Sequence, residues 1–160
     1  MEFLGFSVTQ LCICLFIALL LAAARSDAKS FIIPNRLNVA VFALYVPYVL
    51  SAPTPIQWIM TSVVAGGVLL AGFALFAAGY MGGGDVKLLA STALWAGPEM
   101  VLAFVVLTAL AGGVLSAVVL LQCRYGWVLG LSSAEGPRAV PYGIAIATGG
   151  VFVALQLLTR

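Results

Sequence analysis

Long apolar runs recur along the whole of this 160-residue chain, and their length constrains its fold more than any other feature. A helix rises about 1.5 Å per residue, so about 20 apolar residues are needed to cross the roughly 30 Å hydrocarbon core of a bilayer. Inside that core every backbone polar group must be bonded within the protein, which leaves helices and closed barrels. Runs of this length favour helices over the short alternating strands of a barrel. Because only 8% of the residues are charged, against about a quarter in soluble domains, we expect an integral membrane protein.

The apolar runs predict an all-α, polytopic membrane helical bundle with about six transmembrane helices in a single domain, residues 1–160. The predicted spans cover residues 3–24, 31–50, 56–78, 86–96, 100–123 and 140–158. Gly97 and Pro98 separate the fourth run from the fifth. Pro34 stands near the start of the second span, where a helix does not need the N–H that proline lacks.

Lysine and arginine residues indicate the orientation of these spans, because short loops rich in them stay cytoplasmic. Bases follow the first, third and fifth spans, at Arg25, Lys29, Arg36, Lys87, Arg124 and Arg138. The other loops between spans carry no base, and Arg160 at the extreme C-terminus is the exception to the pattern. We therefore predict that both termini lie outside and that Asp27 and Asp85 lie on the same, cytoplasmic side.

Composition excludes several kinds of chemistry. The chain has no histidine, which removes Ser-His and Cys-His nucleophile pairs and most zinc sites. Its three cysteines lie in or at the end of apolar runs, so we expect small buried hydrophobic residues without a redox or metal role. The net charge is only +2 and the bases are scattered, which is unlike a nucleic-acid footprint. We expect no metal, no cofactor and no nucleic-acid partner, with membrane lipid as the surroundings.

Asp27 and Asp85 are the only aspartates of the chain, and Asp85 follows three glycines at residues 82–84. A charged residue at a membrane helix centre costs about 2.5 to 3.5 kcal/mol on insertion scales, so it calls for a partner, water or a function. Asp85 precedes Gly97 by about 12 residues, which is about 18 Å of helix in a core of roughly 30 Å. This geometry predicts that Asp85 lies below the cytoplasmic interface and inside the protein.

Two carboxylates held within a few ångströms cannot both ionise easily, so one is expected to keep its proton near neutral pH. The ionised acid would deprotonate a water that attacks a peptide carbonyl, and the protonated acid would stabilise the oxygen and later assist departure of the amine. The residues also allow other interpretations. Asp85 could be a helix N-cap while Asp27 pairs with Arg25 or Lys29, or both aspartates could carry protons or bind a cation in a small transporter. We interpret Lys87 as a base that sets topology rather than as a catalytic one.

The sequence also resembles a known family. The GGGD stretch at residues 82–85 fits the GxGD motif of membrane aspartyl proteases, and VKLL at 86–89 continues it as in type IV prepilin peptidases. Asp27, followed by IPN at residues 33–35, resembles the first-aspartate segment of the short TadV/CpaA-like group of Flp (Tad) pilus systems. PYG at residues 141–143 is similar to that group as well, so the resemblance covers nearly the whole chain.

The resemblance implies a protease of the cytoplasmic (inner) membrane that cuts the leader from type IV (Flp-like) prepilins or pseudopilins at the cytoplasmic face. It implies Asp27 and Asp85 as the catalytic pair. Its further motif residues here are Gly82, Gly84, Lys87, Pro34, Asn35 and Pro141. Larger members carry a cysteine-bearing cytoplasmic domain and also methylate the pilin, whereas the first cytoplasmic loop here is too short for such a domain. We expect no methyltransferase activity, and we expect the loop at 131–138 to connect spans rather than contact substrate.

Two rivals remain beside this family. A presenilin-like protease is disfavoured, because the tyrosine-aspartate pairing of that branch is missing at Asp27. A non-catalytic subunit of a pilus assembly would tolerate loss of either aspartate.

Overall fold

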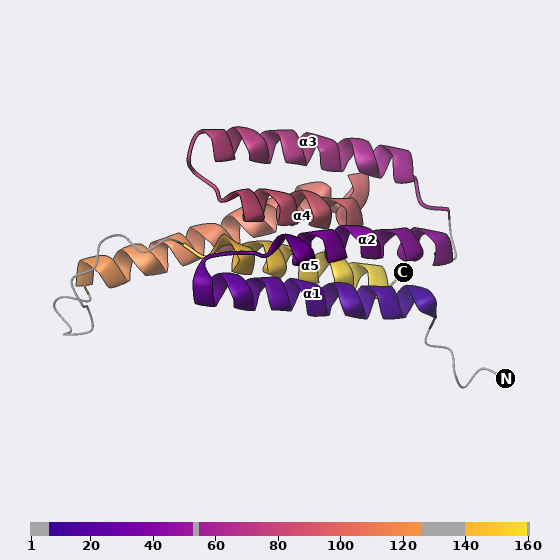
Figure 1. The fold of residues 1–160 in the computed structure, drawn as a ribbon, viewed down its shortest axis with the longest axis horizontal. Helices are drawn as coiled ribbons and strands as arrows, with labels where there is room; N and C mark the ends of the chain where they lie inside the picture. The colour runs from indigo at the N-terminus through magenta and orange to yellow at the C-terminus, as the bar shows by residue number, and fades with distance from the viewer. Residues whose placement is uncertain (1–6, 53–54, 126–139, 160) are drawn as a thin grey trace.

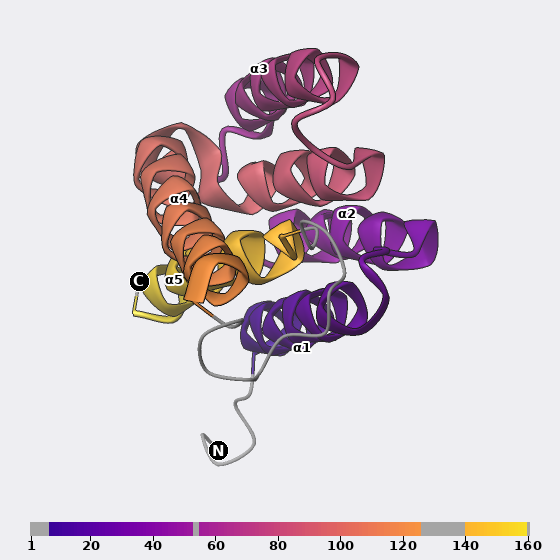
Figure 2. The same ribbon diagram turned by 90° about the vertical axis from the view of Figure 1, so that its left-hand side faces the viewer.

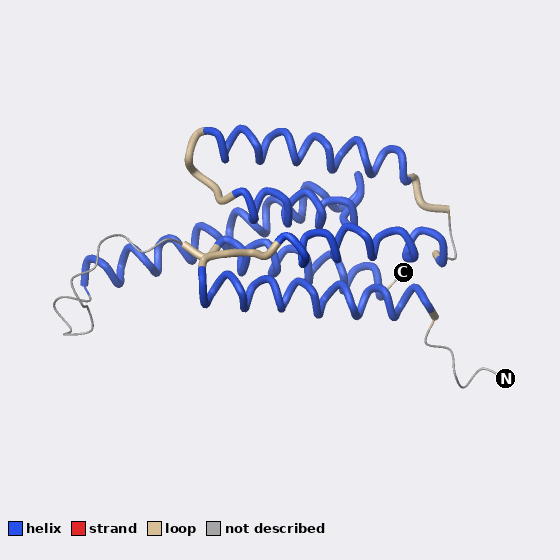
Figure 3. Tube along the Cα trace, in the orientation of Figure 1, coloured by secondary structure: helices blue, strands red, loops and turns tan. Residues whose placement is uncertain are grey.

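The computed structural model describes residues 7–52, 55–125 and 140–159, with side chains described as far as residue 122 in the middle segment. Over these residues the chain is helical, with no strand (Figure 3). The helices are α1 (Val8–Ser30), α2 (Asn35–Ser51), α3 (Trp58–Ala77), α4 (Gly83–Tyr125) and α5 (Tyr142–Leu158). They lie roughly along one direction, with α3 on the outside of the bundle against α4 (Figure 1). The all-α prediction is confirmed.

Helix α4 consists of two segments that meet at Gly97, whose φ of 59° and ψ of −177° are not helical. Glycine accepts a positive φ without a steric penalty, and Pro98 fits the first turn of the second segment because its missing N–H is not needed there. Figure 2 shows the two segments running in different directions. The predicted break between the fourth and fifth apolar runs is therefore present.

Three helices in the described part of the chain are long and apolar enough to cross a membrane: Val8–Ser30, Trp58–Ala77 and the stretch Gly83–Gln122 of α4. Helix α5 is apolar but shorter. Large apolar side chains such as Leu50, Leu70 and Leu102 are exposed on the outer faces, as a lipid surrounding requires. These features support a membrane protein, while the number of crossings and the side on which the termini lie stay predictions.

Helix α1 continues to Ser30, past the predicted end of the first span at residue 24. A capping box between Ser7 and Gln10 starts the helix, and Phe31 ends it in a left-handed conformation whose N–H donates to the Asp27 carbonyl at 2.8 Å. Arg25 and Lys29 do not stop the helix because arginine and lysine are good helix formers. Asp27 is a poorer helix former, but it lies near the end of the helix. Asp27 consequently belongs to the last turn of α1.

The core is centred on Trp95, near the end of the first segment of α4. Its ring stacks on Phe16 of α1, with centroids 4.2 Å apart, and lies 4.8 Å from the ring of Tyr48 in α2. The indole N–H donates to the Val41 carbonyl at 3.1 Å, which satisfies its polar atom in a buried position. Helix α5 packs against both α1 and α4. The helices that carry the two aspartates are thus held in one packed bundle.

Candidate active site

Four helix ends meet at one end of the bundle: the last turn of α1 and the first turns of α2, α4 and α5 (Figure 1). Polar contacts join them in pairs. Gly143 of α5 bonds Asp27 of α1, and side chains at the start of α2 reach the start of α4. The cluster combines segments from nearly the whole length of the chain, and it contains both aspartates.

Asp27 is buried, with 4% of its surface exposed, and its Oδ2 accepts a hydrogen bond from the Gly143 backbone N–H at 2.7 Å. Gly143 is the second residue of α5, where backbone N–H groups have no partner within the helix. A Cβ at this position would lie 2.9 Å from both Cβ and Oδ2 of Asp27, so only glycine allows this approach. The contact differs from the solvated pairing with Arg25 or Lys29 that the sequence left open.

Asp85 is the third residue of α4 and is half-buried. The Gly82 backbone N–H donates to its carboxylate, and a Cβ on Gly82 would lie 2.8 Å from Asp85 Oδ2. Oδ1 is buried, and no donor in the described residues reaches it. Asp85 thus lies inside the first helical turn rather than at the N-cap, with one carboxylate oxygen near the backbone and the other without a partner.

Both carboxyl groups lie at the same end of the bundle, Asp27 in the last turn of α1 and Asp85 in the first turn of α4, and a charge on Asp27 disfavours a charge on Asp85. Like charges brought together in a protein interior favour a shared proton over two full charges. The structure therefore places both aspartates among the same helix ends, whereas direct contact between them and their catalytic role stay predictions.

The other predicted residues lie around this cluster. Lys87 donates from Nζ to Asn35 Oδ1 at 3.0 Å, on the exposed side of the contact between α2 and α4. A Cβ on Gly84 would lie 3.2 Å from the Ile33 carbonyl oxygen, so the α1–α2 connection packs closely on the start of α4. Pro34 and Pro141 are the N-cap residues of α2 and α5 and shape those helix starts. The loop at 131–138 lies outside the described residues.

Sequence reasoning missed Asn38, a buried residue of α2 whose Nδ2 donates to the Gly84 carbonyl at 3.2 Å. It also gave no contact for Gly143, which it noted only as part of a resembling motif. A polar residue inside the apolar run at 31–50 was the signal available for Asn38.

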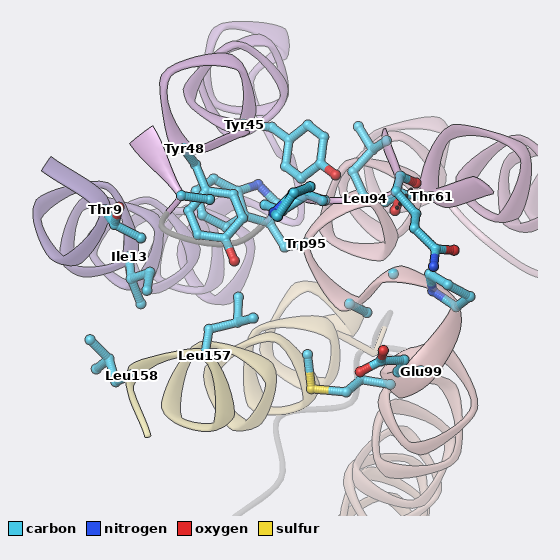
Figure 4. Close-up of a pocket in the computed structure, with 18 of the residues that line it drawn as sticks. Thr9, Ile13, Tyr45, Tyr48, Thr61, Leu94, Trp95, Glu99, Leu157 and Leu158 are labelled. Atoms are coloured by element: carbon cyan, nitrogen blue, oxygen red, sulfur yellow. Dashed lines mark hydrogen bonds between the residues drawn. The ribbon is translucent and has the colours of Figure 1, made fainter. Parts of the chain in front are cut away.

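A cavity of about 380 Å³ lies between other parts of the same helices, beside the break in α4 (Figure 4). Its lining includes Tyr45, Tyr48, Thr61, Trp95 and Glu99, but neither aspartate. Glu99 is the one acid among the described residues that line it. The cavity therefore lacks the pair of carboxylates on which the predicted chemistry depends, and the aspartate cluster remains the candidate site.

Comparison with known protein families gave one match. A model described as the type IV leader peptidase family matches residues 14–117, which is more than half of the chain and includes both aspartates. Comparisons with curated proteins and with solved structures gave no match.

Proposed function

This chain belongs to the type IV leader peptidase family, and from that premise we propose that it is an aspartic endopeptidase of the inner membrane. Its substrates are prepilins or pseudopilins of the Flp type, which carry a short leader before a hydrophobic helix. Cleavage takes place at the cytoplasmic face. The whole chain, residues 1–160, acts as one membrane domain with six crossings and both termini outside.

Asp27 and Asp85 form the catalytic pair in this proposal. The ionised carboxylate takes a proton from a water, and the water oxygen attacks the carbonyl carbon of the scissile peptide bond. The other carboxyl group gives its proton to the carbonyl oxygen. When the tetrahedral intermediate collapses, the first carboxyl group gives the proton it took from water to the departing amine, the carbon–nitrogen bond breaks, and a hydroxyl of the intermediate returns its proton to the second carboxylate. The reaction consumes one water and leaves both carboxyl groups with the protons they started with.

Asp85 has an oxygen that could accept a hydrogen bond from that water. Asp85 Oδ1 is buried without a donor, while the other oxygen of the same carboxylate lies at Gly82. A buried acceptor without a partner is costly, and a water or a substrate N–H would satisfy it. Gly82 beside the carboxylate is exposed and has no side chain, which leaves its backbone open to an extended substrate.

The single observation that carries the proposal is the placement of Asp27 and Asp85 at the same end of the bundle, inside the range matched by the family model. A transporter that uses both acids fits less well, since such a site lies near the membrane midplane between repeats. The connection between α1 and α2 spans only residues 31–34 and has no cysteine, which supports peptidase activity without methyl transfer.

The test expresses the protein in membranes together with a tagged Flp-type prepilin and follows leader removal by the shift in prepilin mobility. Asp27→Asn and Asp85→Asn should each abolish cleavage, because either change removes one half of the acid–base pair. Glu99→Gln is the matched control, since it neutralises an exposed carboxylate away from the aspartates and should leave the rate unchanged. Cleavage at the wild-type rate by either aspartate variant would show that the two-aspartate mechanism is wrong.

A further inference from the structure

Asn38 connects the two halves of the aspartate cluster. It lies in the first turns of α2, 4% exposed, and its Nδ2 donates to the carbonyl of Gly84 at 3.2 Å. Gly84 immediately precedes Asp85 in the first turn of α4. The hydrogen bond therefore fixes the backbone to which the Asp85 side chain is attached.

Packing alone does not account for an asparagine at this position. Burying an amide costs free energy unless all of its polar atoms are bonded, and Asn38 Oδ1 has no partner among the described residues. A leucine of similar volume would pack without that cost. The orientation of the amide follows from its neighbour, because a carbonyl oxygen accepts hydrogen bonds and so must face the NH₂ group. What the asparagine supplies in return is a bond between two helices.

The hydrogen bond from Asn38 to Gly84 joins the two segments that carry the aspartates. Helix α2 begins a few residues after α1 ends, so Asn38 belongs to the hairpin that carries Asp27. Gly84 belongs to the segment that carries Asp85. A second bond between the same helices, from Lys87 to Asn35, is exposed and competes with water, so it holds the geometry less firmly.

We propose that Asn38 is a positioning residue for peptide cleavage, which holds the start of α4 against the α1–α2 hairpin and so sets how Asp85 faces Asp27. The inference rests on the proposed function. Asn38 acts through the Gly84 backbone and does not itself take part in the proton transfers. Its effect should fall on the chemical step rather than on substrate binding.

The experiment measures kcat and KM on the detergent-solubilised full chain, with a synthetic peptide that spans the leader and the first part of the hydrophobic helix of a Flp-type prepilin. Asn38→Leu removes the donor at similar volume, and kcat per folded enzyme should fall about 10- to 100-fold, with KM changed less than about twofold. Asn38→Gln keeps the amide and should recover part of the loss. Ser91→Ala is the control, because it removes another buried side-chain bond to a carbonyl, from Ser91 to Lys87, that lies wholly within α4.

The folded fraction is measured by size exclusion, so that loss of protein is separated from loss of rate. A wild-type kcat per folded enzyme in Asn38→Leu would overturn the proposal, as would an equal fall in Ser91→Ala or a change confined to KM. Asp27→Asn and Asp85→Asn are measured beside these variants. Full cleavage by the aspartate variants would overturn the proposed function itself, whereas their inactivity together with a fully active Asn38→Leu would overturn the role of Asn38 alone.

Discussion

Gly143→Ala would place a methyl group directly against Asp27. The added Cβ would lie 2.9 Å from Asp27 Cβ and 2.9 Å from Oδ2, whereas unbonded carbon atoms prefer about 3.5 to 4.0 Å. Asp27 or the start of α5 must therefore move by about 0.6 to 1 Å. The hydrogen bond from Gly143 N–H to Asp27, now 2.7 Å long, is stretched or lost in that movement.

A misplacement of about 1 Å in an active site costs up to roughly 100-fold in rate, which corresponds to about 2.7 kcal/mol at the transition state. We therefore expect Gly143→Ala to lower kcat about 10- to 100-fold in the prepilin peptide assay. The fold should survive, since alanine is the better helix former by about 1 kcal/mol and offsets part of the strain.

The matched control is Gly113→Ala in α4, where an added Cβ has no atom within 4 Å. This variant should keep the wild-type kcat and the wild-type yield of folded protein. If Gly143→Ala is folded and cleaves at the wild-type rate, the position of Asp27 does not matter for catalysis and the reasoning fails. An equal loss of rate in Gly113→Ala would point to a general effect of the substitution and would also refute it.

Two further predictions concern stability and topology. Trp95→Leu removes the stacking on Phe16 and should lower the unfolding free energy in detergent by about 2 to 4 kcal/mol. The kcat per folded enzyme should stay at the wild-type value, because Asp85 is about 15 Å away along the helix. An unchanged melting temperature would contradict the stability prediction. The topology test places single cysteines in a cysteine-free background. A cysteine in place of the exposed Gln57 should react with an impermeant maleimide added outside, whereas a cysteine in place of the exposed Lys29 should react only after the membrane is opened. The reverse labelling pattern would show that the predicted orientation is inverted.

The helices could be predicted from the sequence because apolar run length is a local property. A helix that crosses a bilayer needs about 20 apolar residues, so such helices can be read from the lengths of the apolar runs. Gly97 and Pro98 interrupt one of these runs, and a proline inside a helix breaks or kinks it. The first apolar run ends at residue 24, but charged residues at a membrane face do not by themselves end a helix. The helix continues to Ser30, where the left-handed Phe31 closes α1.

The candidate site was predictable only in part. Two aspartates on an apolar background stand out, because burial of a carboxylate is costly wherever it occurs. What surrounds them depends on contacts between distant segments, which local patterns do not encode. The bond from Asn38 to Gly84 and the bond from Gly143 to Asp27 both join residues far apart in the chain. Only the packed helices bring these pairs together.

Helix α5 contributes to the site although it lies outside the range that the family model matches, which ends at residue 117. It packs against both α1 and α4, the helices that carry the aspartates. A Cβ on its Gly150 would lie 2.6 Å from a Leu20 methyl of α1 and 2.9 Å from a Thr92 methyl of α4, so this helix sits tightly between the two. Its first turn supplies the N–H that holds Asp27. The family match covers the segments that carry both aspartates, whereas the contact that holds Asp27 comes from a helix beyond that match.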